Sequence, residues 1–155
     1  MRILVIGCVS EDIIHLEQSA QTIHCLGGAG YYTATAASAA GGAVTLLAPR
    51  LNGDLPFVVN QDFCFDWIGP LVETADFPNL EIRQHGNDRA TLCAASWGAE
   101  SMLRPDFLPA NLGEYSIVHI AALSSAERQL EFLRALKERS LCKISIGTYA
   151  RLAYG

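Results

Sequence analysis

Basic residues are scarce in this chain, which has only two lysines, Lys137 and Lys143, among its 11 basic residues. The 16 acidic residues outnumber them, and the formal net charge is −5 at pH 7. A surface that binds nucleic acid gathers lysine and arginine into a patch that contacts phosphates. The composition therefore disfavours nucleic acid as a partner.

Long apolar runs and closely spaced metal ligands are also missing. No apolar stretch reaches the roughly 18 residues that a membrane-spanning helix needs, and the start, Met1 to Gly7, is typical of a buried strand and not of a signal peptide. The five cysteines form no CxxC pair, and the four histidines have no zinc-type spacing. We expect reduced thiols in a cytoplasmic protein, with no membrane partner and no metal site.

Half of the 155 residues are hydrophobic, which suits one packed domain. Continuous apolar runs rich in β-branched residues are typical of strands covered on both faces of a parallel sheet. Four such runs occur, at residues 3–9, 43–48, 116–122 and 143–147. Helical segments alternate with them, so the sequence predicts an α/β fold with right-handed crossovers.

Two helices are predicted between these strands. The first follows Gly27-Gly28-Ala29-Gly30 as a stretch rich in Ala, Thr and Ser that runs to Ala40, and it ends at Gly41-Gly42, a favourable C-terminal pair. The second begins at Ser124-Ser125-Ala126-Glu127, which fits a capping box. Its apolar side carries Leu130, Leu133 and Leu136.

Two hairpins are predicted in addition to the parallel strands. Residues 12–17 and 22–26 flank a polar turn, and residues 81–84 and 90–96 flank a turn rich in Gly, Asn and Asp. Helix and strand patterns conflict in the segment 50–79, where no element can be assigned.

Two glycine-containing motifs form the candidate ligand site. Gly7-Cys8-Val9-Ser10-Glu11-Asp12 places Asp12 just past the first strand, at the edge where open α/β sheets bind ligands. A carboxylate there can accept two hydroxyl hydrogen bonds, which suits a polyol or a ribose. Gly27-Gly28-Ala29-Gly30-Tyr31-Tyr32 places backbone N–H groups without side chains at a helix start. Spacing alone still favours a structural interpretation: an Asp that caps a turn and glycines that close a hairpin.

In their order along the chain, these motifs resemble the amino-terminal half of the ribokinase-like (PfkB-type) family of sugar and nucleoside kinases. The resemblance includes the turn Asn52-Gly53-Asp54 and the second hairpin, at residues 81–96. It implies a Rossmann-type three-layer α/β sandwich, incomplete here, with a small β-hairpin lid. Residues 1–155 would form its substrate-binding portion, with lid strands at approximately 12–26 and 81–97.

The resemblance also implies roles for individual residues. Asp12 would hydrogen-bond hydroxyls of the sugar or ribose, Ser10 would serve the same purpose, and the lid residue Ala95 would help to cover the substrate. The backbone that lines the substrate would be that of Gly27, Gly28, Ala29 and Gly30. Tyr32 stands where ribokinases carry Asn, and its ring offers a stacking face that suggests a nucleoside.

The sequence departs from the family in ways that limit these expectations. The segment 119–122 lacks the substrate-contacting carboxylate that ribokinases place there. The family takes its catalytic base from a Gly-Ala-Gly-Asp element in its other half, whereas Tyr31 follows Gly28-Ala29-Gly30 here. Asn111-Leu112-Gly113-Glu114 matches the family's magnesium-linked motif only as a string, far upstream of its usual place. We therefore expect no catalytic residue and no cofactor in this chain, although ATP and Mg²⁺ serve the parent family.

Two functions remain open at this stage. The first is the substrate-binding half of an ATP-dependent sugar or nucleoside kinase, truncated and inactive as this isolated chain, because the sequence ends soon after a strand expected to be central. The second is a non-catalytic small-molecule-binding or assembly module, which would be a homo-oligomer. A dinucleotide-binding oxidoreductase is disfavoured, because the glycines do not directly follow the first strand and Arg50 is the charged residue nearest the end of the 43–48 strand.

Overall fold

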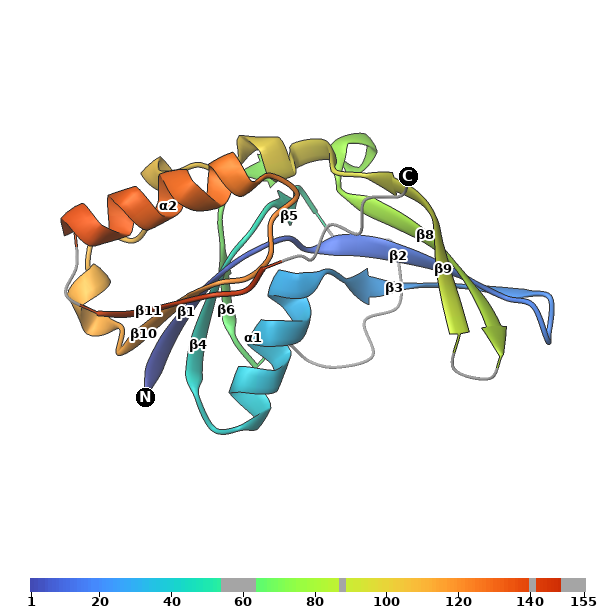
Figure 1. Ribbon diagram of the computed structural model, residues 1–155, viewed down its shortest axis with the longest axis horizontal. Helices are drawn as coiled ribbons and strands as arrows, with labels where there is room; N and C mark the ends of the chain where they lie inside the picture. Colours follow the sequence, from blue (N-terminus) through green and yellow to red (C-terminus); the bar gives the residue numbers. More distant parts are fainter. Residues whose placement is uncertain (54–63, 87–88, 140–141, 149–155) are drawn as a thin grey trace.

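A parallel five-stranded sheet forms the centre of the molecule (Figure 1). The structure is a computed structural model that describes residues 1–53, 64–86, 89–139 and 142–148. The strands lie in the order β11-β10-β1-β4-β6, and every neighbouring pair is parallel. Their bounds are β1 Arg2–Ile6, β4 Ala43–Leu47, β6 Asp66–Ile68, β10 Ile117–Ile120 and β11 Lys143–Ile146. The predicted parallel α/β sheet is confirmed.

Two helices, α1 (Ala29–Ala39) and α2 (Ala126–Arg139), cover opposite faces of this sheet (Figure 1). Alternate residues of a strand point to opposite faces. Val5 accordingly belongs to the core cluster that contains Ala34 of α1, whereas Leu4 belongs to the cluster that contains Phe132 of α2. Each helix thus has its own apolar layer, and β1 contributes to both.

The second helix differs in detail from the prediction. Leu136 is fully buried as expected, but Leu130 is exposed and Phe132 is buried in its place. The helix is also capped differently, because Ser125 Oγ accepts the Arg128 N–H at 3.3 Å while Ser124 bonds elsewhere. The helix was predicted correctly, and so were Leu133 and Leu136 of its apolar side, which pack in the core; Leu130 and the cap were not.

Helix α1 packs directly against the residue that follows β1, because Gly7 and Gly30 meet there without side chains. A Cβ atom on Gly7 would lie 2.7 Å from Gly30 Cα, and one on Gly30 would lie 2.8 Å from Cys8 O. The Gly30 N–H donates to the same Cys8 carbonyl at 2.9 Å. The first turn of α1 is therefore fixed against the connection from β1 to β2.

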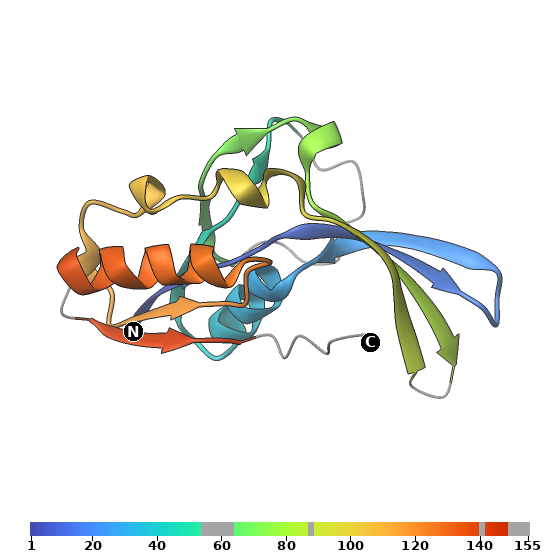
Figure 2. The same cartoon turned by 45° about the horizontal axis from the view of Figure 1, so that its top comes forward.

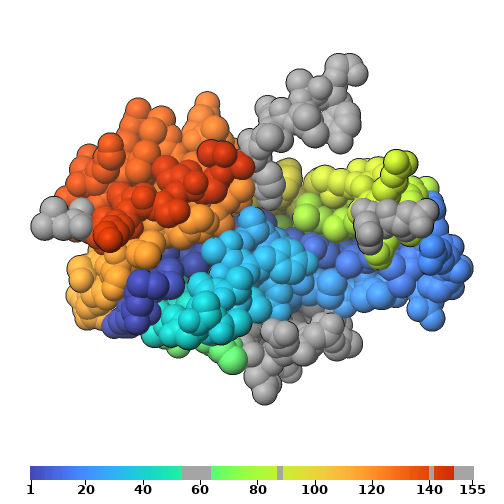
Figure 3. All heavy atoms as spheres, turned by 60° about the horizontal axis from the view of Figure 1, so that its bottom comes forward, coloured from blue at the N-terminus to red at the C-terminus, as the bar shows by residue number. Residues whose placement is uncertain are grey.

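A second sheet, the lid sheet, projects from the body of the molecule (Figures 2 and 3). Its strands lie in the order β3-β2-β8-β9. Their bounds are β2 Ser10–Leu16, β3 Gln21–Gly27, β8 Asn79–Gly86 and β9 Arg89–Ser96. Both predicted hairpins form, and they join through a parallel pairing of β2 with β8.

The two faces of the lid sheet differ in chemistry. One face has an aliphatic row in which Ile23 pairs with Ile14, Ile14 with Ile82, and Ile82 with Leu92. The opposite face and the sheet end contain three His–Glu pairs, two between neighbouring strands and one between β8 and the turn that joins β2 to β3. They are His15–Glu81 at 3.0 Å, His24–Glu11 at 2.6 Å and His85–Glu17 at 2.9 Å. The aliphatic row therefore marks the face that the lid can pack against other groups.

Short elements fill the segments between the two sheets. The unassigned segment 50–79 contains β6, a two-stranded parallel pair and a 3₁₀ turn. The short elements are β5 Arg50–Leu51, β7 Leu71–Val72, η1 Thr74–Asp76, η2 Gly98–Met102, η3 Pro105–Phe107 and η4 Leu112–Glu114. Asp54 of the expected turn and residues 87–88 of the second hairpin turn lie outside the described residues. Among the helices that are described, none is both long and apolar enough to cross a membrane.

The glycine contact between β1 and α1 is testable. Gly30→Ala should lower the free energy of unfolding by about 1–3 kcal/mol, because the added Cβ meets backbone atoms that cannot move aside. This cost outweighs the roughly 1 kcal/mol by which Ala is favoured over Gly inside a helix. Gly113→Ala is the matched control, since a Cβ there meets nothing within 4 Å. Urea titrations in which both variants are as stable as the wild type would contradict the role assigned to the contact.

Candidate functional site

The candidate site lies where β1, the lid sheet and helix α1 meet. Asp12 belongs to β2, which starts just after the carboxyl end of β1, and it is only 4% exposed. Ser10 Oγ donates to Asp12 Oδ1 at 2.7 Å, and the Tyr32 hydroxyl donates to Asp12 Oδ2 at 3.3 Å. The structure thus brings together the three polar side chains that were predicted to bind the substrate.

The glycines of the second motif have packing roles around this carboxylate. A Cβ on Gly27 would overlap the Asp12 carboxylate, which lies directly against the Gly27 backbone. Gly28 has φ of 95°, and a Cβ there would lie 2.6 Å from Cys8 O. The Gly30 N–H already bonds Cys8 O. This N–H is therefore occupied, while substrate lining by the backbone of Gly27 to Gly30 stays a prediction.

Burial controls the ionisation of the groups at the site. It raises the pKa of Asp12, and the hydrogen bonds from Ser10 and Tyr32 oppose that rise because they stabilise the carboxylate. Burial and the neighbouring Asp12 charge raise the pKa of Tyr32 to about 12. Burial and the same charge also raise the pKa of Cys25, whose Sγ lies 3.8 Å from Asp12 O. These groups form one coupled cluster.

The lid residue Ala95 lies on the same face as Asp12 but at a distance from it. Asp12 pairs with Leu80 of β8, and Leu80 pairs with Ala95 of β9. Adjacent strands are about 4.8 Å apart, so roughly 10 Å of sheet separates the two residues. Ala95 can contact a ligand that extends along the lid, and it does not touch Asp12.

Sequence reasoning missed a buried carboxylate near this edge of the sheet. Glu100, in η2, is only 2% exposed, and its Oε1 accepts the Ser124 N–H at 2.7 Å and the Ser124 hydroxyl. Burial raises the pKa of the Cys8 thiol, and Glu100 adds to that rise. In the sequence, only the apolar neighbours of Glu100 could have indicated that this carboxylate is buried. Through its bonds to Ser124, Glu100 connects the segment after the lid strand β9 to the start of α2.

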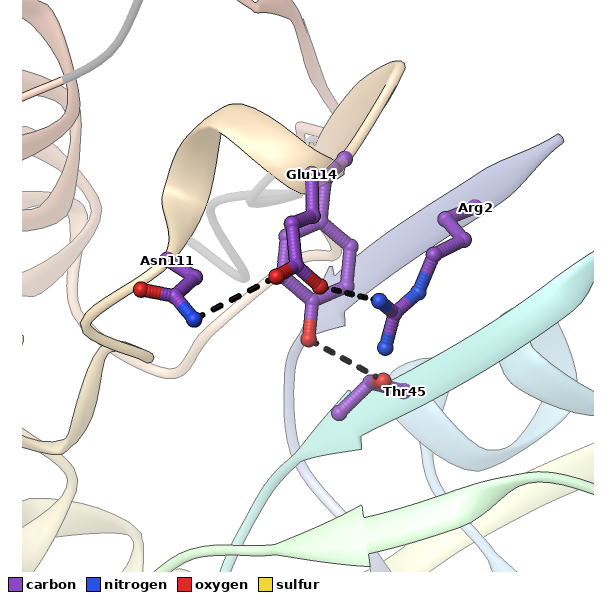
Figure 4. Close-up of polar contacts among 5 residues, drawn as sticks. Arg2, Thr45, Asn111 and Glu114 are labelled. Carbon is purple, nitrogen blue, oxygen red and sulfur yellow. Dashed lines mark hydrogen bonds and ion pairs between the residues drawn. The ribbon is translucent and has the colours of Figure 1, made fainter.

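The string Asn111-x-x-Glu114 lies beside the amino end of β1, away from the candidate site, and Figure 4 shows its polar contacts. Glu114 forms an ion pair with Arg2, the first residue of β1, and accepts a hydrogen bond from Asn111 Nδ2 at 3.3 Å. The Arg2 guanidinium lies over the Tyr115 ring at 5.4 Å, and the Tyr115 hydroxyl donates to Thr45 Oγ1 at 3.2 Å. These contacts give the string a structural role. Within the described residues, no three His, Cys, Asp or Glu side chains could hold a metal ion together.

His119 lies on β10 and is partly buried. Its Nδ1 is 3.1 Å from Ser145 Oγ on the neighbouring strand β11, and burial lowers its pKa. This environment agrees with a histidine that has a hydrogen-bond partner inside the fold.

Comparison with known proteins identifies the fold. No protein-family model and no curated protein matches the chain. Solved structures that share the fold include ribokinase from Giardia lamblia, at 16% identity and a TM-score of 0.76. The alignment covers 99% of this chain and 53% of the ribokinase chain. They also include adenosine kinase from Sinorhizobium meliloti, at 12% identity and a TM-score of 0.70. That alignment covers 93% of this chain and 55% of the adenosine kinase chain.

Fructokinase with bound ATP from Xylella fastidiosa is similar as well, at 18% identity and a TM-score of 0.69, with coverage of 97% and 49%. The chain thus spans about half the length of these structures. They confirm the predicted ribokinase-like fold and, at the level of fold, the predicted resemblance. The roles assigned to Ser10, Asp12, Tyr32 and Ala95 stay predictions.

The buried carboxylate gives a test that separates a ligand-binding role from a structural one. Because the folded-state pKa of Asp12 is raised, its stabilising effect is present below the pKa of the unfolded chain and is lost as the pH rises through the folded-state pKa. At pH 7 the ionised group therefore costs stability. Asp12→Asn should unfold at an equal or higher urea concentration than the wild type at pH 7, and the difference should shrink toward pH 4.

Asp106→Asn, at an exposed position, is the control and should leave stability unchanged. If Asp12→Asn instead unfolds more easily at pH 7, Asp12 acts as a structural cap, which is the interpretation that spacing alone favoured.

Proposed function

We propose that this chain is the substrate-binding half of an ATP-dependent kinase that phosphorylates a hydroxyl of a sugar or nucleoside. On its own it binds the substrate and does not transfer phosphate. The observation that supports this most is the Asp12 carboxylate, which is buried at the carboxyl edge of a parallel sheet.

A buried carboxylate at this place is suited to binding hydroxyl groups. Its two oxygens accept hydrogen bonds from alcohols, and hydrogen bonds to a charged acceptor are stronger than those between neutral groups. Open α/β sheets bind ligands at the carboxyl ends of their strands, where Asp12 lies. The lid sheet extends from the same point and presents Ala95 on the Asp12 face. A small polyol would therefore meet a polar group at one end and the lid above it.

The remaining chemistry is assigned to groups outside these 155 residues. The sequence contains no Gly-Ala-Gly-Asp element, and the similar solved structures are about twice as long. In the complete enzyme, a base would accept the proton of the substrate hydroxyl as its oxygen bonds to the γ-phosphorus of ATP and ADP departs. ATP and Mg²⁺ would bind mainly to those other groups.

Isothermal titration with D-ribose, D-fructose and adenosine tests the binding part of the proposal. At least one of the three should bind, and Asp12→Asn should weaken that binding by about 10- to 100-fold, because hydrogen bonds to a charged group contribute about 1.5–3 kcal/mol. Asp106→Asn should bind as the wild type does. Absence of binding to all three, or unchanged affinity in Asp12→Asn, would refute the proposal.

The inactive character of the isolated chain needs a separate assay. With ATP, Mg²⁺ and whichever of the three compounds binds, the chain should form no phosphorylated product above the uncatalysed rate. Product formation that depends on Asp12 would show that the 155 residues contain a complete catalytic site.

A second candidate, an assembly module, is favoured by one observation. The aliphatic row of the lid leaves Leu92 55% exposed and Ile23 42% exposed on the same face. Exposed apolar side chains in one row are typical of association surfaces. We propose that two copies of the chain pair through this face of their lids.

Sedimentation velocity tests this pairing. The wild type should sediment as a dimer. Leu92→Lys should raise the dissociation constant of this dimer by more than about tenfold, so that monomer predominates. Ala94→Lys is the control, since Ala94 lies on the opposite face beside Glu81. A monomeric wild type, or equal effects of the two substitutions, would refute pairing through the aliphatic row.

A further inference from the structure

The Asp12 carboxylate has hydrogen bonds from its own chain on both oxygens. Ser10 donates to Oδ1 at 2.7 Å, and Tyr32 donates to Oδ2 at 3.3 Å. With Gly27 packed against it, the carboxylate is 4% exposed, whereas Tyr32 is 55% exposed. Tyr32 is therefore the group that lies between Asp12 and the solvent on the Oδ2 side.

The position of the phenol is set by the fold. Tyr32 lies in the first turn of α1, and its N–H donates to Gly28 O at 3.1 Å. Its ring lies 5.7 Å from that of Tyr31, which in turn lies 6.3 Å from the ring of Phe65. The backbone of Tyr32 is thus held by the helix, and one side of its ring is packed.

The phenol has the chemistry of a ligand hydroxyl. A carboxylate that holds two neighbouring alcohols gives one oxygen to each. At Asp12 the place at Oδ2 is taken by an aromatic alcohol that is part of the protein and that covers the solvent side of this oxygen. Oδ1 accepts only the fully buried Ser10 hydroxyl, and because a carboxylate oxygen has two lone pairs, Oδ1 can still accept one ligand hydroxyl. Because the pKa of Tyr32 is raised to about 12, this phenol keeps its proton and remains a donor at every pH near neutrality.

We infer that Tyr32 is a specificity-determining residue whose hydroxyl takes the place of one ligand hydroxyl at Asp12. The inference rests on the proposed function. It assigns to the site a substrate that presents a single hydroxyl to Asp12. A vicinal diol should therefore bind with nearly the same affinity as its deoxy counterpart. A substrate of this class is a deoxysugar or a deoxynucleoside as readily as a ribose.

Binding of matched pairs tests the inference. The pairs are adenosine with 2′-deoxyadenosine and 3′-deoxyadenosine, and D-ribose with 2-deoxy-D-ribose, measured by isothermal titration. In the wild type, diol and deoxy compounds should differ in affinity by less than about threefold. Tyr32→Phe keeps the ring and removes the hydroxyl, so the preference for the diol should rise to roughly tenfold, the effect of one hydrogen bond to a charged acceptor.

Tyr31→Phe is the matched control, since it removes a phenol oxygen from the adjacent residue, and it should leave the ratio at the wild-type value. A wild type that already prefers diols tenfold, or a Tyr32→Phe ratio equal to that of the wild type, overturns the inference. In either case, weaker binding in Asp12→Asn would still support the proposed function. If no compound binds the wild type, both the proposed function and the inference fail.

A measurement without ligand tests the contact itself. The ultraviolet absorbance of the phenolate, taken as the difference between the wild type and Tyr32→Phe, reports the titration of Tyr32. Asp12→Asn should lower the pKa of Tyr32 below about 12 but not to that of an ordinary tyrosine, because burial, the largest cause of the rise, remains while the neighbouring negative charge is removed. An unchanged pKa would show that the phenol does not occupy Oδ2 and would overturn the inference.

Discussion

The contact between Gly7 at the end of the first strand and Gly30 in the first turn of α1 is the constraint on which the candidate site depends. With no side chain on either residue, the helix approaches until the Gly30 N–H reaches Cys8 O. The lid hairpin β2–β3 lies between these two glycines in the sequence, so its two ends are brought together at the same place. Asp12, near the start of the hairpin, and Tyr32, just after its end, become neighbours for this reason.

Burial of a carboxylate is unfavourable unless other groups compensate for the lost water. At Asp12 the compensation comes from two hydroxyl donors, which lower the pKa of the carboxyl, while burial, the larger effect, raises it. Glu100 differs, since Ser124 satisfies one of its oxygens through both a backbone and a side-chain donor. Glu100 thus links η2 to the start of α2, and its other oxygen, Oε2, is buried without a hydrogen-bond partner among the described residues, whereas both oxygens of Asp12 already accept hydroxyl hydrogen bonds.

Much of the architecture could be predicted because it depends on local patterns. Apolar runs and turn residues predicted the parallel strands and both hairpins, and the motif order predicted the fold. Features set by distant contacts were missed. The exposure of Leu130 depends on which side of α2 meets the sheet, the partner of Ser124 lies 24 residues away, and no pattern near Tyr32 indicates that its hydroxyl reaches Asp12. Residue types at the site were predictable, but their mutual hydrogen bonds were not.

The place of β1 in the sheet has a consequence for how the chain acquires its structure. This strand lies between β4 and β10, and its register joins Ile6 to Ile120. Pairings between residues so far apart in sequence slow folding, because a long loop must close before the contacts form. During synthesis, β1 must therefore wait, with the edge that faces β10 unpaired, until more than 110 further residues have followed it.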